Sequence, residues 1–229
     1  MNITFRWYGR GNDTVKLEQI KQIPGVRGIV WALHHKQVGE MWSKQEIKKE
    51  VEYIQSFGFH TEVVESVNIH EAIKLGTEDR IQYIENYKKT IRNLAEFGVK
   101  VICYNFMPIF DWTRSEMFYP LGDGSTALFY EKAKIESWDP QELIRTVSAS
   151  SDLTLPGWEP EKLDQISELF EAYKNVDETQ LWGNLEFFLN EILPVAEEVG
   201  IRMAIHPDDP PWSIFGLPRI ITGSKSYEK

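Results

Sequence analysis

Apolar positions along the chain switch repeatedly between helical spacing and short strand-like runs. Three times, a stretch of helical spacing ends at a glycine, and a run containing β-branched residues follows at once. The three glycines are Gly58, Gly98 and Gly200. Glycine adopts the left-handed backbone that ends a helix without steric cost, and β-branched runs suit buried strands. The pattern therefore predicts three helix–glycine–strand units.

Capping residues locate the starts of the three helices. Ser43 and Glu46 form a capping box that is expected to begin the first helix. Asp79 is expected to cap the second helix and Asn184 the third. Pro194 lies inside the third helical pattern, where its missing N–H is expected to kink the helix or split it.

Two further strands are predicted before the repeat, at residues 3–8 and 26–33, with a short helix between them. Strict alternation of strands and helices favours a parallel sheet and, among α/β folds, a (β/α)8 TIM barrel. Such a barrel needs eight strands, and about five βα units are present by residue 206. We therefore expect residues 1–229 to be a single barrel domain that is incomplete at its C-terminal end, with a smaller fold as the alternative.

The spacing of the glycines predicts an insertion. Gly58 and Gly98 are 40 residues apart, whereas Gly98 and Gly200 are 102 residues apart. The excess lies in residues 108–181, which follow the fourth predicted strand. Barrel active sites form at the carboxyl ends of the strands, so this insertion is expected over that face. A lid and an oligomer contact are both compatible with it.

Turn signals inside the insertion predict its elements. Asp123-Gly124 predicts a hairpin turn between strands at 116–121 and 125–131. Pro140 and Pro160 stand at the favoured first position of two short helices.

Polar and ionisable residues follow each predicted strand, as an active site at the carboxyl face requires. In chain order they are Arg6, Trp7, Tyr8 and Arg10; His34 and His35; Glu65 and Asn68; Asn105 and Asp111; and His206, Asp208 and Asp209. His206, in a His-Pro-Asp-Asp motif, suits a divalent metal; the alternative is a hydrogen-bonded turn without metal. His34 and His35 are neighbours, so one ring is expected to face the cavity and the other to point outward. Cys103 is expected to be a small core residue rather than a nucleophile.

Composition narrows the function classes. Hydrophobic residues make up 42% of the chain, and its single cysteine excludes an intrachain disulfide. The net charge of −10 disfavours nucleic acid and anionic membrane as partners. There is no glycine-rich phosphate loop and no serine-elbow motif. We therefore expect a soluble, cytoplasmic protein that acts on a small molecule. The chain has eight tryptophans, of which Trp7, Trp112 and Trp212 follow predicted strand ends; they either wall a polyol site or pack the insertion onto the barrel.

Six blocks of sequence carry a resemblance to a known family. They are Phe5–Gly9, Gly28–His34, Val64–His70, Cys103–Arg114, Met203–Pro211 and Phe215–Arg219. In these blocks the chain resembles the N-terminal two-thirds of the mannonate dehydratase family, whose fold is a xylose-isomerase-like TIM barrel.

The resemblance implies loss of water from D-mannonate, a step of hexuronate (glucuronate) breakdown, to give 2-dehydro-3-deoxy-D-gluconate. It implies a divalent ion, usually Mn2+, with Fe2+ or Mg2+ as alternatives, and makes His206 a metal ligand. The other ligands and the proton-transfer residues are expected beyond Lys229. From the strand ends, we predict that a set of residues binds the small sugar-acid substrate: Arg6, Tyr8, His34, Asn105 and Asp208.

Two alternatives to this function are compatible with the sequence. One is a metal-dependent sugar isomerase or epimerase on the same barrel, which moves hydrogen without releasing water. The other is a non-catalytic, truncated barrel, because one ligand does not hold a metal firmly. A homo-oligomer (a dimer) is also left open as a partner.

Overall fold

The computed structural model describes residues 2–150 and 165–229 and falls into two compact units. Unit 1 consists of Met1–Phe106 and Leu181–His206, and unit 2 of Met107–Gln180 and Pro207–Lys229. The first segment of unit 2 begins and ends within one residue of the insertion predicted at 108–181. The single-domain organisation and the position of the insertion over the carboxyl face stay predictions.

Unit 1 is built on a five-stranded sheet in which every neighbouring pair is parallel. In their order across the sheet, the strands are β1 (Ile3–Arg6), β2 (Val26–Trp31), β3 (His60–Glu65), β4 (Val101–Tyr104) and β7 (Arg202–Ile205). The order follows the chain, with helices between successive strands, so the predicted α/β class with a parallel sheet is confirmed.

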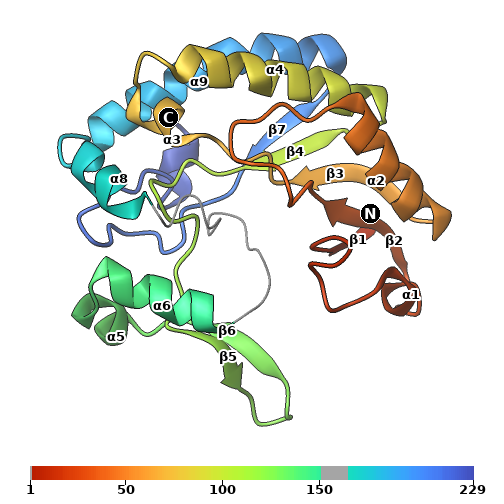
Figure 1. Cartoon of the computed structure of the whole chain (residues 1–229), viewed down its shortest axis with the longest axis horizontal. Helices are drawn as coiled ribbons and strands as arrows, with labels where there is room; N and C mark the ends of the chain where they lie inside the picture. The colour runs from red at the N-terminus through yellow and green to blue at the C-terminus, as the bar shows by residue number, and fades with distance from the viewer. Residues whose placement is uncertain (1, 151–164) are drawn as a thin grey trace. The chain divides into compact units, whose positions relative to one another are not determined.

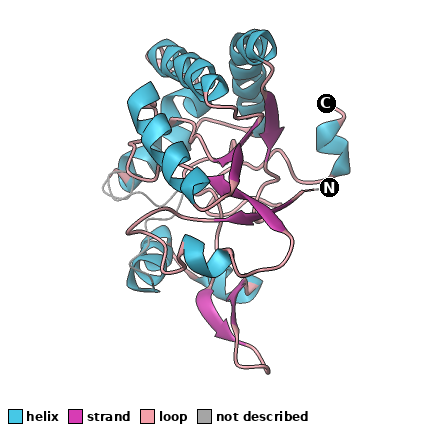
Figure 2. Ribbon diagram, turned by 90° about the vertical axis from the view of Figure 1, so that its right-hand side faces the viewer, coloured by secondary structure: helices cyan, strands magenta, loops and turns pink. Residues whose placement is uncertain are grey.

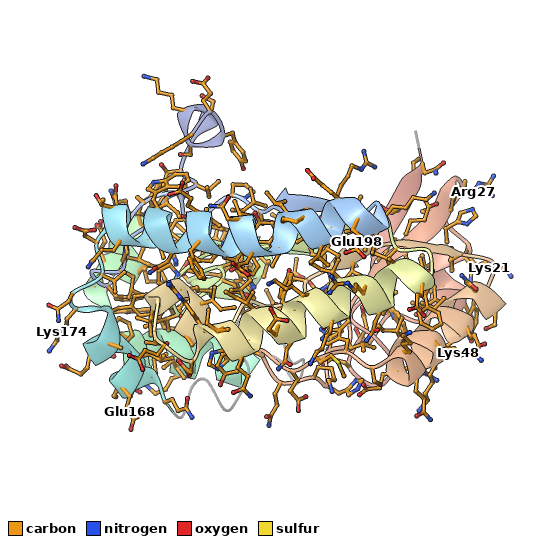
Figure 3. The ribbon with its side chains drawn as sticks, turned by 90° about the horizontal axis from the view of Figure 1, so that it is seen from above. Lys21, Arg27, Lys48, Glu168, Lys174 and Glu198 are labelled. Carbon is orange, nitrogen blue, oxygen red and sulfur yellow. The ribbon has the colours of Figure 1, made fainter. Side chains whose placement is uncertain are left out.

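Helices cover one face of this sheet. They are α1 (Leu17–Ile20), α2 (Lys44–Ser56), α3 (Glu71–Leu75), α4 (Arg80–Glu96) and α9 (Glu178–Val199), of which α2, α4 and α9 lie along the sheet (Figure 1). Helices α4 and α9 lie side by side (Figure 3), joined by ion pairs between Lys88 and Glu191 at 2.5 Å and between Arg92 and Glu198 at 3.1 Å. Among the described helices, none has the length and apolar composition needed to cross a bilayer.

Alternation along the strands separates the two faces of the sheet. Trp31, Val64 and Ile102 are almost fully buried, and the ring of the buried Tyr104 lies 6.1 Å from that of Phe188 in α9. The intervening residues are only half-buried and pair across neighbouring strands, namely Val30, Val63, Val101 and Cys103. The hydrophobic core of unit 1 therefore lies between the sheet and its helices, and these half-buried residues project from the opposite face.

The helix starts test the capping predictions. Ser43 and Glu46 form the predicted capping box of α2. Asp79 occupies the N-cap of α4, but its side chain makes no capping hydrogen bond. The prediction for Asn184 is wrong, because α9 starts at Glu178 and the Asp177 side chain accepts the hydrogen bond from Gln180 N at 2.8 Å.

Helix α9 continues through Pro194 without being split. Six residues on the helix are buried, namely Leu181, Leu185, Phe188, Ile192, Val195 and Ala196. Burial of this face on both sides of the proline offsets the one hydrogen bond that proline cannot donate. Asn184, inside the helix, instead donates to Lys74 O at 2.8 Å.

Unit 2 contains a two-stranded antiparallel hairpin and short helices, coloured by type in Figure 2. Its elements are β5 (Glu116–Pro120), β6 (Thr126–Phe129), α5 (Lys132–Ser137), α6 (Pro140–Ser150), α8 (Ile166–Tyr173) and the 3-10 turn η1 (Ser224–Tyr227). The predicted hairpin is confirmed, with Gly124 in its turn at φ 85°. The helix predicted at Pro140 is also confirmed, whereas the one predicted at Pro160 lies outside the described residues.

Candidate functional site

Parallel strands bring their carboxyl ends to one edge of the sheet in unit 1. That edge carries most of the residues predicted from the strand ends: Arg6 and Glu65 close β1 and β3, His34 follows β2, Asn105 follows β4 and His206 follows β7. Asp208, Asp209 and Asp111 belong to unit 2, where Asp111 is buried.

Arg6 is held in place by backbone carbonyls. Its Nη1 donates to Trp7 O at 3.0 Å and to Val30 O at 3.4 Å. Its Nε lies 3.8 Å from Glu65 Oε2, and the guanidinium carbon lies 4.6 Å from the centre of the Tyr8 ring. Burial lowers the pKa of Arg6, and Tyr8 and Glu65 oppose that shift. Arginine remains charged at neutral pH, so the edge presents a fixed cation in an acidic protein.

The loop that follows β1 positions Tyr8. The Asp13 carboxylate accepts from Tyr8 N at 2.9 Å and from Val15 N at 2.8 Å, and Asn12 Nδ2 donates to Tyr8 O at 3.0 Å. Sequence reasoning missed Asp13. An Asp whose side chain binds the N–H two residues later is a recognised turn signal, and the sequence Gly-Asn-Asp-Thr-Val carries it.

His34 is half-buried beside Tyr8, with 5.6 Å between the ring centres. Its Nε2 is buried and has no hydrogen-bond partner in the described part of the chain. Burial lowers the pKa of His34 to about 3, and the nearby Arg6 and His35 act in the same direction. The ring is therefore neutral at pH 7. The His35 side chain is 64% exposed, with its Nε2 3.3 Å from Glu46 Oε1, so the two rings differ in environment as predicted.

Cys103 lies opposite Glu65 in the register of β3 and β4. Burial raises the pKa of the Cys103 thiol to about 11, and the charge of Glu65 adds to this shift. The thiol is protonated at neutral pH, which makes it a poor nucleophile. This agrees with the prediction that Cys103 is not a nucleophile, but Cys103 is half-buried on the face of the sheet opposite the helices and is not the core residue that was predicted.

Arg10 does not join Arg6. Its Nη2 donates to Glu50 Oε2 at 3.0 Å, and its guanidinium carbon lies 4.1 Å from the centre of the Tyr53 ring, so it packs on α2. Trp7, also considered for the site, is 3% exposed, and its Nε1 donates to Val15 O at 2.9 Å. Of the aromatic and cationic residues at the end of β1 and in the loop after it, Arg6 and Tyr8 are the two that remain candidates.

His206 is exposed at the end of β7, where its backbone N donates to Tyr104 O at 2.7 Å. Within residues 2–150 and 165–229, no three His, Cys, Asp or Glu side chains form a group that could hold a metal ion. One imidazole does not make a metal site, so the described residues do not by themselves fit a bound divalent ion.

In unit 2, Asp208 binds backbone N–H groups and Asp209 binds an arginine side chain. Asp208 is 4% exposed, and its Oδ2 accepts from Ile220 N at 2.6 Å and from Ile221 N at 3.1 Å. Asp209 binds Arg114 through two hydrogen bonds of 2.8 and 2.7 Å. These contacts give Asp208 a structural role, and its part in substrate binding stays a prediction.

Known proteins resemble this chain along its whole length. The model of the D-mannonate dehydratase (UxuA) family matches residues 1–229. The mannonate dehydratase of Bacillus subtilis (strain 168) is 76% identical over 229 residues, and that of Shouchella clausii (strain KSM-K16) is 60% identical over 229 residues. Each match covers 100% of this chain and 64% of the relative, so the chain spans just under two thirds of their length.

A solved structure agrees with these sequence matches. The crystal structure of mannonate dehydratase from Streptococcus suis serotype2 superposes with a TM-score of 0.86 at 44% sequence identity. It covers 100% of this chain, which in turn covers 59% of that chain.

Proposed function

Because the chain belongs to the D-mannonate dehydratase (UxuA) family, we propose that it is part of an enzyme that removes water from D-mannonate to give 2-dehydro-3-deoxy-D-gluconate. The match of the family model to residues 1–229 carries this proposal. The polar carboxyl edge of the sheet supports it, because this is where barrel enzymes hold their substrates. The reaction is a hydro-lyase step, here assigned to hexuronate breakdown in the cytoplasm.

The proposed fold of the whole protein is a (β/α)8 barrel, of which this chain supplies five strands. Strands β1 and β7 are the two outermost strands of the observed sheet, and each pairs with one neighbouring strand. Three more strands between β1 and β7 would complete the barrel. The matched relatives support this arrangement, because the chain covers only 64% of their length.

The residues of unit 1 supply binding rather than proton transfer in this proposal. Arg6 provides a positive charge for an anionic sugar acid. This charge acts locally against the negative field of a protein whose net charge is −10. Tyr8, His34 and Asn105 line the same edge and offer hydrogen bonds to substrate oxygens. Loss of water also needs a base at the α carbon and an acid at the departing hydroxyl. We assign those two groups to the part of the protein that this chain does not cover.

The proposed cofactor is Mn2+, with Fe2+ or Mg2+ as alternatives, and His206 is its one proposed ligand in this chain. A divalent ion would offset the negative charge that develops on the substrate acid. The described residues provide no group of three ligands, so the remaining donors must come from outside them.

Product analysis tests the proposed function. The full-length protein that contains this chain is incubated with D-mannonate and Mn2+, with and without a chelator, and the 2-keto-3-deoxy acid is quantified. We expect chelator-sensitive formation of a product that is lighter than the substrate by one water. A product of unchanged mass would instead indicate an isomerase or epimerase. No product from a folded, metal-loaded protein would exclude both reactions.

A further inference from the structure

We propose that Arg6 and His34 together form the subsite for the carboxylate of the substrate, and that this pair makes the site prefer a sugar acid to its neutral analogue. The inference rests on the proposed function for the identity of the sugar acid. It adds a specific role for two residues of unit 1.

Arg6 has the geometry of an anion anchor. Its Nη1 is occupied by two backbone carbonyls, and its Nε faces Glu65 at 3.8 Å. Its Nη2 makes no hydrogen bond to any described residue, while the side chain is 21% exposed. The guanidinium is thus held rigidly by one nitrogen and presents another to the edge of the sheet. Hydrogen bonds between a guanidinium and a carboxylate are charge-assisted and strong, most of all where water is partly excluded.

His34 supplies the second, neutral contact. Its Nε2 is buried without a partner among the described residues, and buried polar atoms of native proteins nearly always have one. A bound ligand that reaches this nitrogen satisfies it. With a pKa of about 3, the imidazole is neutral at pH 7, so it can donate a hydrogen bond from Nε2 without adding a charge. That arrangement suits one oxygen of a carboxylate whose charge is already matched by Arg6.

Tyr8 links the two residues. Its ring lies 4.6 Å from the guanidinium carbon of Arg6 and 5.6 Å from the centre of the His34 ring. Asp13 fixes the backbone of Tyr8, so the pair is preorganised before a ligand arrives. Preorganised contacts bind more tightly because less conformational freedom is lost on binding.

Glu65 suggests a competing explanation, in which Arg6 only neutralises this neighbouring carboxylate. The Glu65 side chain is 38% exposed and its closest oxygen is 3.8 Å from Arg6 Nε, so the pair is a weak one. Because Arg6→Lys retains a charge for Glu65 and loses the planar fork, it separates a charge-neutralising role from a carboxylate-binding role.

The test compares D-mannonate with D-mannonamide, in which a neutral amide replaces the carboxylate. Affinities for both are measured by calorimetry on the metal-loaded, full-length protein; where D-mannonate is turned over, KM and inhibition constants replace the Kd values. We expect the unsubstituted protein to prefer D-mannonate by about 10- to 100-fold, the range of a charged hydrogen bond. Arg6→Gln should abolish this preference while changing D-mannonamide binding by less than about 3-fold. Arg6→Lys should retain part of the preference, and His34→Leu should weaken D-mannonate binding by about 10-fold.

Arg27→Gln is the matched control. Arg27 is exposed near the amino end of β2, at the opposite edge of the sheet (Figure 3), and its substitution removes the same charge. It should leave both affinities within about 2-fold, as expected of an exposed charge away from the ligand.

The outcomes separate this inference from the proposed function. An unchanged preference in folded Arg6→Gln overturns the inference, even if the protein dehydrates D-mannonate. Equal losses for both ligands in Arg6→Gln and Arg6→Lys also overturn it, because they indicate a structural role only. If Arg6→Gln does not fold, the preferences of Arg6→Lys and His34→Leu decide. A carboxylate preference that depends on Arg6, in a protein that forms no dehydrated product, supports the inference and rejects the proposed function.

Discussion

Unit 2 buries Arg219 and Asp208 almost completely, at 2% and 4% exposure, whereas unit 1 leaves Arg6 and His34 partly open at the edge of its sheet. Arg219 donates to Pro108 O at 3.3 Å and to Phe110 O at 3.0 Å, and Asp208 accepts from two consecutive backbone N–H groups. In unit 2, charged side chains therefore take the place of regular secondary structure and hold irregular loops together.

In unit 1 the strands are already paired in a parallel sheet, so charged side chains such as Asp13 brace loops and not the strands themselves. Arg6 uses one nitrogen for support and leaves the other at the sheet edge, and His34 Nε2 is without a partner among the described residues. Charged side chains therefore brace loops in unit 2, whereas Arg6 and His34 of unit 1 keep polar nitrogens available at the carboxyl ends of the strands, which suits their proposed binding role. Substitutions in unit 2 should therefore act mainly on stability, and substitutions at the edge in unit 1 mainly on binding.

The largest expected effect is the loss of Arg219. Arg219→Met leaves the buried carbonyls of Pro108 and Phe110 without their donor and should lower the free energy of unfolding by about 3 kcal/mol. Chemical denaturation monitored by circular dichroism measures it. Arg145→Met is the control, because Arg145 is exposed and pairs with Glu142 within its own helix; it should leave the free energy of unfolding unchanged. Similar stability of the two variants would contradict the bracing role.

Two aspartates that bind backbone N–H groups provide the sharpest contrast. Asp208→Ala should destabilise the protein by about 2 kcal/mol, because it leaves two buried N–H groups of unit 2 without an acceptor. Asp13→Ala should change stability by less than about 1 kcal/mol, because its hydrogen bond to Val15 N is exposed and that to Tyr8 N is only part-buried. It should nevertheless weaken D-mannonate binding by about 10-fold, because Tyr8 loses its support. Calorimetry measures D-mannonate binding and thermal melts measure stability for both variants. A larger stability loss in Asp13→Ala than in Asp208→Ala, with binding weakened only in Asp208→Ala, would contradict the comparison.

His34 should make the protein less stable in mild acid. Its pKa is about 3 in the folded chain, against 6.5 normally, so the unfolded chain binds the extra proton first. Stability is then complete above pH 6.5 and falls as the pH drops toward 3, by about 1 to 2 kcal/mol between pH 7 and pH 5. Burial is the main cause of the lowered pKa, and the charge of Arg6 and the neighbouring His35 act in the same direction. His34→Asn should remove this part of the pH dependence, as read from denaturation at several pH values; an unchanged slope would refute the assignment.

The smallest expected effect concerns Glu46 in the capping box of α2. Burial raises its pKa, but hydrogen bonds from Ser43 and His35 and the charge of Lys36 outweigh it and lower the pKa to about 2, from 4.5. A lowered pKa means that the stabilisation is present above pH 4.5 and is lost as the pH falls toward 2. Glu46→Gln should therefore cost less than about 1 kcal/mol at pH 7. Its difference from the unsubstituted protein should vanish near pH 2, and a difference that persists there would point to packing instead.

Local signals predicted much of unit 1. The glycine caps at Gly58, Gly98 and Gly200, each with positive φ, mark the ends of helices, and the strands after them lie where β-branched runs predict them. Capping is harder to predict when several residues qualify, as the start of α9 shows. Asp177 and Asn184 are both good caps; the helix uses Asp177, and Leu181, which lies between the two, is buried inside the helix.

Periodicity and turn residues act over a few positions. The sequence alone was therefore sufficient to predict the parallel α/β pattern, the hairpin around Gly124 and the polar residues at the ends of the strands. Pairings between distant residues depend on how the strands and loops come together. Three contacts are of this kind: Arg6 lies near Glu65, 59 residues away; Arg10 binds Glu50 of α2; and Arg219 donates to Pro108 O. Each contact either shifts the pKa of a side chain or gives a donor its acceptor. The burial that makes these effects large exists only once the chain has folded.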